Sequence, residues 1–265
     1  MNRRLRSLFN ASAAVLTLSM ASAAHAAFVP GDAVVDPGLT GTVETNVWSN
    51  DSITIQKNLG FPGFPGTGAW PSPIGSDSGG DATLNKTSNG NGGGPYPASG
   101  SIYFGGFSGD INNFDGTLQV SDATPVANLA NVVFQVEIGE AWTYDFYNHV
   151  LPTLSYNGGN QAIAPTLALA LAKFDNGTVV MPTGPETVYI NTHLLQWDLS
   201  GIATPITSFS ISFNGVQHAQ LYDLRLDQSD VYTAYGASAA VPEPASLSLV
   251  GLGLSAILVL RKRRQ

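Results

Sequence analysis

Histidines and carboxylates are the side chains here best suited to acid–base or metal chemistry, but their spacing matches no catalytic motif. After residue 26 the histidines are His149, His193 and His218, with no H-E-x-x-H pattern and no pair at metal-ligand spacing. No serine lies in a G-x-S-x-G elbow. The chain has no cysteine, which excludes thiol nucleophiles, thiolate-bound metals and disulfides. We therefore expect no catalytic residues, no cofactor and no enzymatic activity.

Two glutamates and one histidine deserve separate consideration. Glu137 and Glu140 could supply carboxylates for glycoside hydrolysis, which needs one protonated acid and one ionised partner at a set separation. Glu137 falls on the polar face of a predicted strand, so we expect it to be solvated. In a regular strand His218 would lie on the same face as Tyr222 and Leu224, which favours a packed, hydrogen-bonded imidazole over a metal ligand.

A run of oxygen-bearing side chains from Asp110 to Gly116 is the candidate calcium site. The run, Asp110-Ile111-Asn112-Asn113-Phe114-Asp115-Gly116, offers the carboxylate and amide oxygens that a hard cation prefers. Its spacing departs from an EF-hand loop, and no glutamate closes it. A hairpin turn rich in Asp and Asn has the same composition, and we favour that interpretation.

Aromatic residues at alternate positions are the candidate glycan contacts. Trp142, Tyr144 and Phe146 fall on one face if their segment is extended, and sugar rings stack on such platforms. The same face would also bury well inside a sandwich, and we favour core packing. Trp142 and Tyr144 remain the residues to test for glycan binding.

Alternation with a period of two residues dominates the chain and predicts strands. It is clear from Val132 to Ile138, from Ser208 to Phe213, and at Tyr222, Leu224 and Leu226. Turns are expected at Asn214-Gly215 and, after Leu167, Leu169 and Leu171, at Asp175-Asn176-Gly177. Many short strands separated by Gly/Asn turns indicate an all-β fold. We predict an antiparallel β-sandwich of jelly-roll or immunoglobulin-like type.

Residues 60–100 differ in composition from the rest. These 41 residues include 12 glycines and 6 prolines, and such a segment buries too little apolar surface to offset its ordering entropy. We predict a long exposed Gly/Pro-rich loop, or a linker after a small hairpin. Its aromatic residues either cap the sandwich, which we favour, or are exposed to contact a ligand: Phe61, Phe64, Trp70 and Tyr96.

The charge of the central segment restricts its partners. Residues 27–240 carry 18 acidic and 4 basic side chains, a formal charge of −14. A surface this acidic repels phosphate backbones, so nucleic acid is not an expected partner. At some 214 residues the segment is long enough to form one domain with its own core, without disulfides.

The first 26 residues have the order of a secretory signal peptide. Arg3, Arg4 and Arg6 precede an apolar, small-residue stretch, and Ala24-His25-Ala26 supplies the A-x-A pattern that signal peptidase requires. We expect cleavage after Ala26, which leaves Ala27 at the mature N-terminus. The predicted divisions are 1–26, 27–240 and 241–265.

The last 25 residues combine a short motif, an apolar run and a basic terminus. Pro242-Glu243-Pro244 precedes 16 uncharged residues, 245–260, which as a helix would span roughly 24 Å. A cluster of four basic residues follows, and the positive-inside preference would hold it in the cytoplasm: Arg261, Lys262, Arg263 and Arg264. We predict a single transmembrane helix that anchors the precursor in the inner membrane, with the domain outside.

This C-terminal arrangement resembles that of the PEP-CTERM proteins, bacterial exported proteins processed by membrane-embedded exosortases. The resemblance rests on Pro242, Glu243 and Pro244 with the apolar run and basic terminus, and it leaves the family of residues 27–240 unidentified. It implies an exosortase partner, removal of the tail, and an association with exopolysaccharide at the cell surface or in the extracellular matrix. The expected function is that of a non-enzymatic surface or matrix protein. The alternatives are a lectin-like carbohydrate-binding module and, less favoured, a polysaccharide hydrolase.

Overall fold

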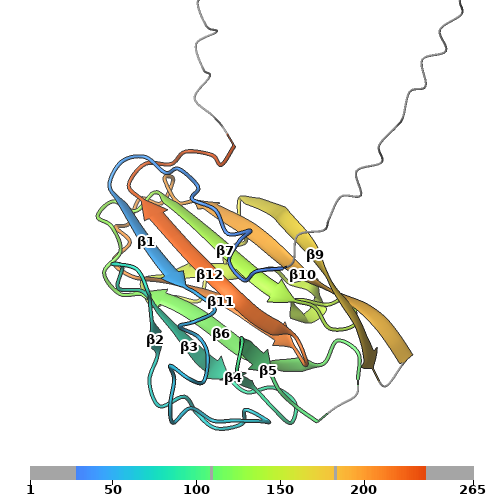
Figure 1. The fold of residues 1–265 in the computed structure, drawn as a ribbon. Helices are drawn as coiled ribbons and strands as arrows, with labels where there is room; N and C mark the ends of the chain where they lie inside the picture. Colours follow the sequence, from blue (N-terminus) through green and yellow to red (C-terminus); the bar gives the residue numbers. More distant parts are fainter. Residues whose placement is uncertain (1–27, 108–109, 182–183, 237–265) are drawn as a thin grey trace, which may run out of the picture.

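The computed structural model describes residues 28–107, 110–181 and 184–236, which form two antiparallel β-sheets packed face to face (Figure 1). Every strand pair is antiparallel, and the described helical structure is one short 3-10 segment, Tyr147–His149 (η1). The all-β, antiparallel prediction is therefore confirmed.

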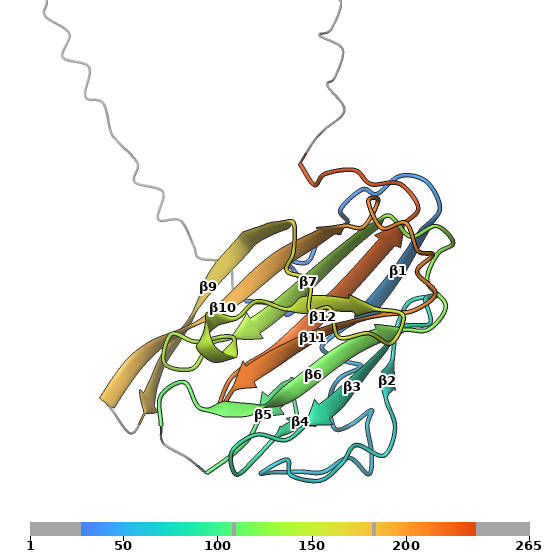
Figure 2. The same ribbon diagram turned by 180° about the vertical axis from the view of Figure 1, so that it is seen from behind.

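The seven-stranded sheet has the order β4-β5-β12-β7-β10-β9, with β1 also paired to β12. Its strands are β1 (Val43–Trp48), β4 (Pro95–Pro97), β5 (Ile102–Phe104), β7 (Asn131–Gly139), β9 (Leu167–Met181), β10 (Gly184–Asp198) and β12 (Gln220–Ser229). The five-stranded sheet has the order β2-β3-β6-β11-β8 and is seen in front in Figure 2. Its strands are β2 (Ile74–Gly75), β3 (Thr83–Ser88), β6 (Phe114–Asp122), β8 (Thr153–Tyr156) and β11 (Phe209–Val216).

The core lies between the sheets and follows the alternation in the sequence. Val132, Phe134, Val136 and Ile138 of β7 all belong to it and are fully buried. From the opposite sheet, Phe213 of β11 places its ring 6.0 Å from that of Phe134. Burial on this scale is the main stabilising contribution to such a sandwich.

The outer face of β7 is buried as well, beneath an N-terminal strap formed by residues 28–38 (Figure 1, blue). Gln135 bonds both backbone groups of Val35: its Oε1 accepts from the amide nitrogen at 2.9 Å, and its Nε2 donates to the carbonyl oxygen at 2.6 Å. Glu137 Oε1 accepts from the Gly31 amide at 3.0 Å. The prediction that Glu137 is solvated is wrong, because the strap covers the face on which it lies.

Residues 60–100 are more structured than predicted. The prediction of one long loop is wrong, since this stretch contains β2, β3 and β4. Its glycines pack backbone directly on backbone: a Cβ on Gly93 would lie 2.1 Å from the Gly105 carbonyl oxygen, and one on Gly66 would lie 1.9 Å from that of Gly94. Glycine here permits close approach of chain segments rather than disorder.

The hairpin expected at Asn214-Gly215 is absent from the described fold. β11 continues to Val216, and the next strand, β12, lies in the other sheet. A Cβ on Gly215 would come within 2.1 Å of the Phe104 ring. Gly215 therefore makes room for a core aromatic at a position where the register with β6 shifts.

Two further predictions fail at bulges. β9 runs through Asp175-Asn176-Gly177 without a turn, because Asn176 and Gly177 form a bulge opposite β10. In β12 a register shift between Leu221 and Asp223 places Tyr222 on the outer face, where its ring lies 5.4 Å from that of Phe28. Leu224 and Leu226 lie in the core as expected.

Candidate functional site

Trp142 and Tyr144 do not form an exposed platform. Trp142 is 3 % exposed and packs against His218, with ring centroids 5.5 Å apart. Tyr144 is partly buried against the core and stacks on His149 at 4.1 Å. Trp142 is thus buried and Tyr144 half-buried, which agrees with inward packing, whereas glycan binding by these two residues stays a prediction.

The oxygen donors between Asp110 and Gly116 face different partners. The Asn112 amide bonds Asn148, and the Asn113 amide bonds Gln217. Asp115 lies at the start of β6, fully buried, with neither carboxylate oxygen hydrogen-bonded. Burial raises the pKa of Asp115 to about 8, although the nearby Lys86 charge opposes this. The run is thus a loop leading into a strand, not a hairpin turn, and calcium binding by it stays a prediction.

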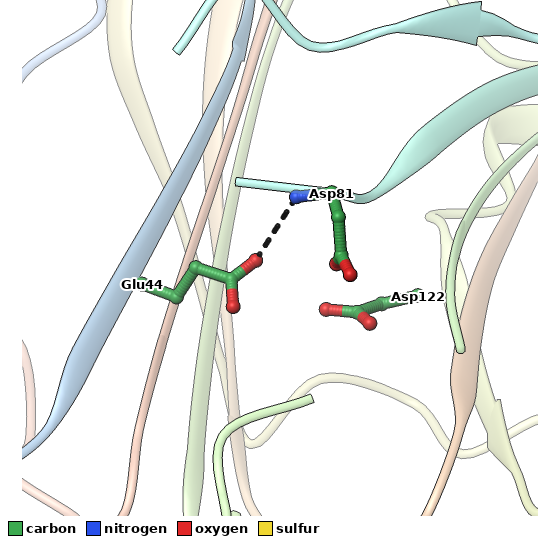
Figure 3. A group of neighbouring side chains, drawn as sticks. All are labelled: Glu44, Asp81 and Asp122. Atoms are coloured by element: carbon green, nitrogen blue, oxygen red, sulfur yellow. Dashed lines mark hydrogen bonds between the residues drawn. The ribbon is translucent and has the colours of Figure 1, made fainter. Parts of the chain in front are cut away.

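Carboxylates do converge elsewhere, at Glu44, Asp81 and Asp122 (Figure 3). One oxygen from each lies within 4.8 Å of the others. Glu44 comes from β1, Asp81 from the turn before β3, and Asp122 from the end of β6. The pairing of β1 with β12 and of β3 with β6 brings these three segments to one end of the sandwich.

The electrostatics of this cluster follow from its burial and its hydrogen bonds. Burial raises the pKa of Asp122, hydrogen bonds from Gln228 and Thr124 lower it, and the charges of Glu44 and Asp81 raise it again. Asp122 is buried, Glu44 is half-buried and Asp81 is exposed, so the group opens to solvent on one side. Such an oxygen-only set could hold a divalent cation such as calcium. Motif spacing did not indicate it, because its members lie on three separate strands or turns.

A second polar network joins Glu140, Asp145, Asn191, His193 and Lys173. The His193 Nε2 and Asp145 Oδ2 atoms are 2.6 Å apart, and Asn191 Nδ2 donates to both Glu140 Oε2 at 3.2 Å and Asp145 Oδ2 at 3.3 Å. Burial raises the pKa of Asp145, but the hydrogen bond and charge of His193 outweigh it, and the net shift is downward.

The position of this network indicates a structural role. Lys173 Nζ lies 3.4 Å from Glu140 and 4.1 Å from the centre of the Tyr189 ring. Trp142 and Thr143, between the two acids, have φ values of 49° and 70°, the left-handed region that a β-branched threonine rarely adopts. The network fastens this strained loop to β9 and β10.

His218 and the aromatic residues of 60–100 differ in how far they are buried. The Tyr103 hydroxyl and His218 Nδ1 lie 2.5 Å apart, which confirms a packed, hydrogen-bonded histidine. In residues 60–100, Trp70 is buried and Phe61 packs against the core, whereas Phe64 is 54 % exposed. The Phe64 ring meets that of Phe107, itself 73 % exposed, edge-on at 5.0 Å.

The terminal predictions fall outside the described residues. They comprise the cleavage residues Ala24, Ala26 and Ala27, the motif Pro242 to Pro244, the apolar run 245–260 and the basic residues Arg261 to Arg264. Across residues 28–107, 110–181 and 184–236, no helix combines the length and apolarity needed to traverse a bilayer.

Comparison with known proteins identifies a motif at the C-terminus but no relative of the sandwich. Residues 240–264 match the family model described as the PEP-CTERM protein-sorting motif. Searches of curated proteins and of solved structures returned no match. The motif implies export, exosortase-dependent processing, and a membrane-anchored precursor that then reaches the cell surface or the exterior. The chain is therefore a PEP-CTERM domain-containing protein whose exported part has no identified family.

Proposed function

We propose that this protein is a non-catalytic component of the cell surface or extracellular matrix, held in or near exopolysaccharide after exosortase removes its C-terminal tail. The sorting motif at residues 240–264 carries the proposal. The acidic composition adds support, since a formal charge of −14 over residues 27–240 favours a dispersed, hydrated protein over one bound to nucleic acid or anionic lipid.

The architecture fits a binding or scaffolding role. From β5 onward successive strands frequently change sheet: β5, β7, β10 and β12 lie in one sheet, and β6, β8 and β11 lie in the other. This alternation supports the jelly-roll form of the predicted sandwich over the immunoglobulin-like form.

Processing is tested by intact mass and by one substitution. We expect the released wild-type protein to begin at Ala27 and to lack the apolar run and basic terminus. Glu243→Ala should accumulate as a full-length, membrane-bound form, because the motif would no longer be recognised. The conservative control is Leu260→Ile, which preserves an apolar tail. Normal release of the Glu243 variant would contradict exosortase sorting through this motif.

Matrix association is tested separately, by fractionation. In a host that makes exopolysaccharide, we expect the processed protein to sediment with the matrix. In the same host lacking that polymer it should appear in the free medium. Equal distribution in both hosts would remove exopolysaccharide from the proposal and leave the sorting pathway untouched.

A lectin-like function is the second candidate, and the exposed Phe64–Phe107 pair favours it. Two aromatic rings in contact yet 54 % and 73 % exposed can offer apolar faces to a sugar ring. Replacing both by alanine should abolish sedimentation with purified host exopolysaccharide. Val180→Ala, at an exposed apolar residue on β9, is the control and should retain it. Full retention by the double variant would exclude this surface.

A further inference from the structure

The outer edge of β9 is the long unprotected edge in the described part of the fold. β9 is 15 residues long, ends the seven-stranded sheet and pairs with β10 alone. Its free edge therefore presents a row of backbone donors and acceptors, which is a template for another strand. Figure 1 shows β9 (gold) at the margin of its sheet.

The other described edges are short or covered. β4 has three residues with proline at both ends, and β2 has only two residues. β8 is bridged by Ile163, whose backbone exchanges two hydrogen bonds with Leu154. The free side of β1 is occupied by the 76–78 turn, where the Asp77 amide donates to the Val47 carbonyl. Proteins commonly block sheet edges in these ways, and β9 is the exception.

The side chains of β9 are those of an interface rather than of a solvated margin. Leu169, Val179 and Val180 are 38 %, 37 % and 84 % exposed, so three of the large exposed apolar side chains lie on one strand. Lys173 and Asp175, the charged residues of the strand, lie between them. Within its own chain Lys173 lies 3.4 Å from Glu140, and Asp175 accepts a hydrogen bond from the Gly177 amide at 2.8 Å, so each would share its charge between these contacts and a partner strand.

The charges and apolar residues of β9 are arranged symmetrically about Phe174. If two copies pair antiparallel with Phe174 opposite Phe174, Lys173 of each copy lies opposite Asp175 of the other. The same register places Leu169 opposite Val179, and Ala168 opposite Val180. Residues directly opposite in an antiparallel pair lie on the same face and interact, so both the ion pairs and the apolar pairs would form.

The irregularities of β9 obey the same symmetry. Relative to β10, the strand has one extra residue at Leu171 and another at Asn176-Gly177. In the register centred on Phe174, Leu171 lies opposite Gly177. Each bulge of one copy therefore meets a bulge of the other, and the stretch between them, which includes Lys173 and Asp175, remains regular.

We propose that two copies of this protein pair antiparallel through β9 about a two-fold axis at Phe174, which joins their seven-stranded sheets into one continuous sheet. The arrangement is isologous, so it closes at two copies. The Lys173–Asp175 complementarity is what selects a second copy over an unrelated strand.

The absence of cysteine from the chain allows a direct test. Opposite Cα atoms in an antiparallel pair lie about 4.5–5.5 Å apart, within the range a disulfide can bridge. In the full chain, Phe174→Cys should give a disulfide-linked dimer under oxidising conditions. Ala170→Cys and Thr178→Cys, which the register places opposite each other, should stay monomeric alone and cross-link when mixed.

The charge arrangement supplies an independent arm. In the Phe174→Cys background, Asp175→Lys should lower the dimer yield several-fold, because lysines then face each other. Adding Lys173→Asp should restore part of the yield by exchanging the charges, and Lys173→Asp alone is the control for loss of the Lys173–Glu140 ion pair within each copy. The proposal is overturned if Phe174→Cys gives no dimer. It is also overturned if each single cysteine cross-links as well alone as in the mixture, or if Asp175→Lys has no effect.

Discussion

The centre of the seven-stranded sheet, at β7, and its margin, at β9, differ in burial and in the polarity of their side chains. At the centre, β7 is buried on both faces: core residues fill one side, and the strap closes the other over Gln135 and Glu137. At the margin, β9 has one neighbour and leaves apolar side chains in solvent. The polar groups are thus in the protected part of the sheet and the apolar groups in the open part, the reverse of the usual distribution. Gln135 and Glu137 at the centre each have a specific hydrogen-bond partner, whereas Leu169, Val179 and Val180 at the margin remain partly or largely exposed.

The largest difference between the two regions should appear on truncating an apolar side chain in each. Phe134→Ala removes a fully buried ring from the core, and we expect a loss of about 3–5 kcal/mol in the free energy of unfolding. Leu169→Ala on β9 should cost less than about 1 kcal/mol, since its side chain is already partly solvated. Urea titrations of the two variants measure this contrast. Similar losses would mean that β9 is buried in solution even at low protein concentration.

Removing a hydrogen-bond partner of the strap should lower the free energy of unfolding by less than Phe134→Ala and by more than Leu169→Ala. Gln135→Ala leaves the Val35 backbone groups without their side-chain partner, and we expect a loss of about 1–3 kcal/mol. Limited proteolysis should then cut within residues 28–38 before any other site. The matched control, Thr178→Ala on exposed β9, should change stability by less than about 0.5 kcal/mol. Unchanged protease resistance of the Gln135 variant would show that the strap is held by other contacts.

The free energy of unfolding should depend on pH through the buried carboxyl of Asp223. Burial, together with the charge of Glu137, raises the pKa of Asp223 from 3.8 to about 8 in the folded protein. Between these values the folded state retains a proton that the unfolded state has lost. Stability should therefore be greatest near pH 4, decline towards pH 8, and level off above it, with a slope of at most about 1.4 kcal/mol per pH unit for this group.

The variant Asp223→Asn should reduce that slope. Part should remain, because burial also raises the pKa of Asp115, on β6, to about 8. Thermal unfolding between pH 4 and 9 measures the profile. An identical slope in Asp223→Asn and wild type would show that this carboxyl is ionised in the folded protein.

The sequence predicted correctly those strands in which regular alternation alone decides which side chains are buried. Alternation in β7 identified four core residues, because the sheet there is regular and its inner face is fully buried. Alternation failed at Tyr222, where a bulge changes the parity of the strand, and the turn predicted at Asp175-Asn176-Gly177 is a bulge within β9. Asn214-Gly215 predicts a turn from composition alone, but glycine is required there by the close approach of the Phe104 ring.

The candidate site was less predictable still. The position of Glu137 on a polar face was correctly inferred, but its burial depends on a strap about one hundred residues away. Glu44, Asp81 and Asp122 meet only because of strand pairing, and no local motif connects them. The exposed Phe64 was among four aromatics named for residues 60–100, but its contact with Phe107 depends on two loops meeting.

The strap also has a consequence for how the domain matures. Residues near the start of the domain are satisfied by β7 and by β12: Asp36 lies 3.5 Å from Arg225, and β1 pairs along β12 up to Ser229. Segments near the start and the end of the described sandwich thus complete each other. Until both segments are in place, the carboxyls of Glu137 and Asp223 are open to water and the sheet lacks its cover. A truncation that removes either segment would therefore expose buried faces of the sheet, and such incompletely folded chains are prone to aggregation.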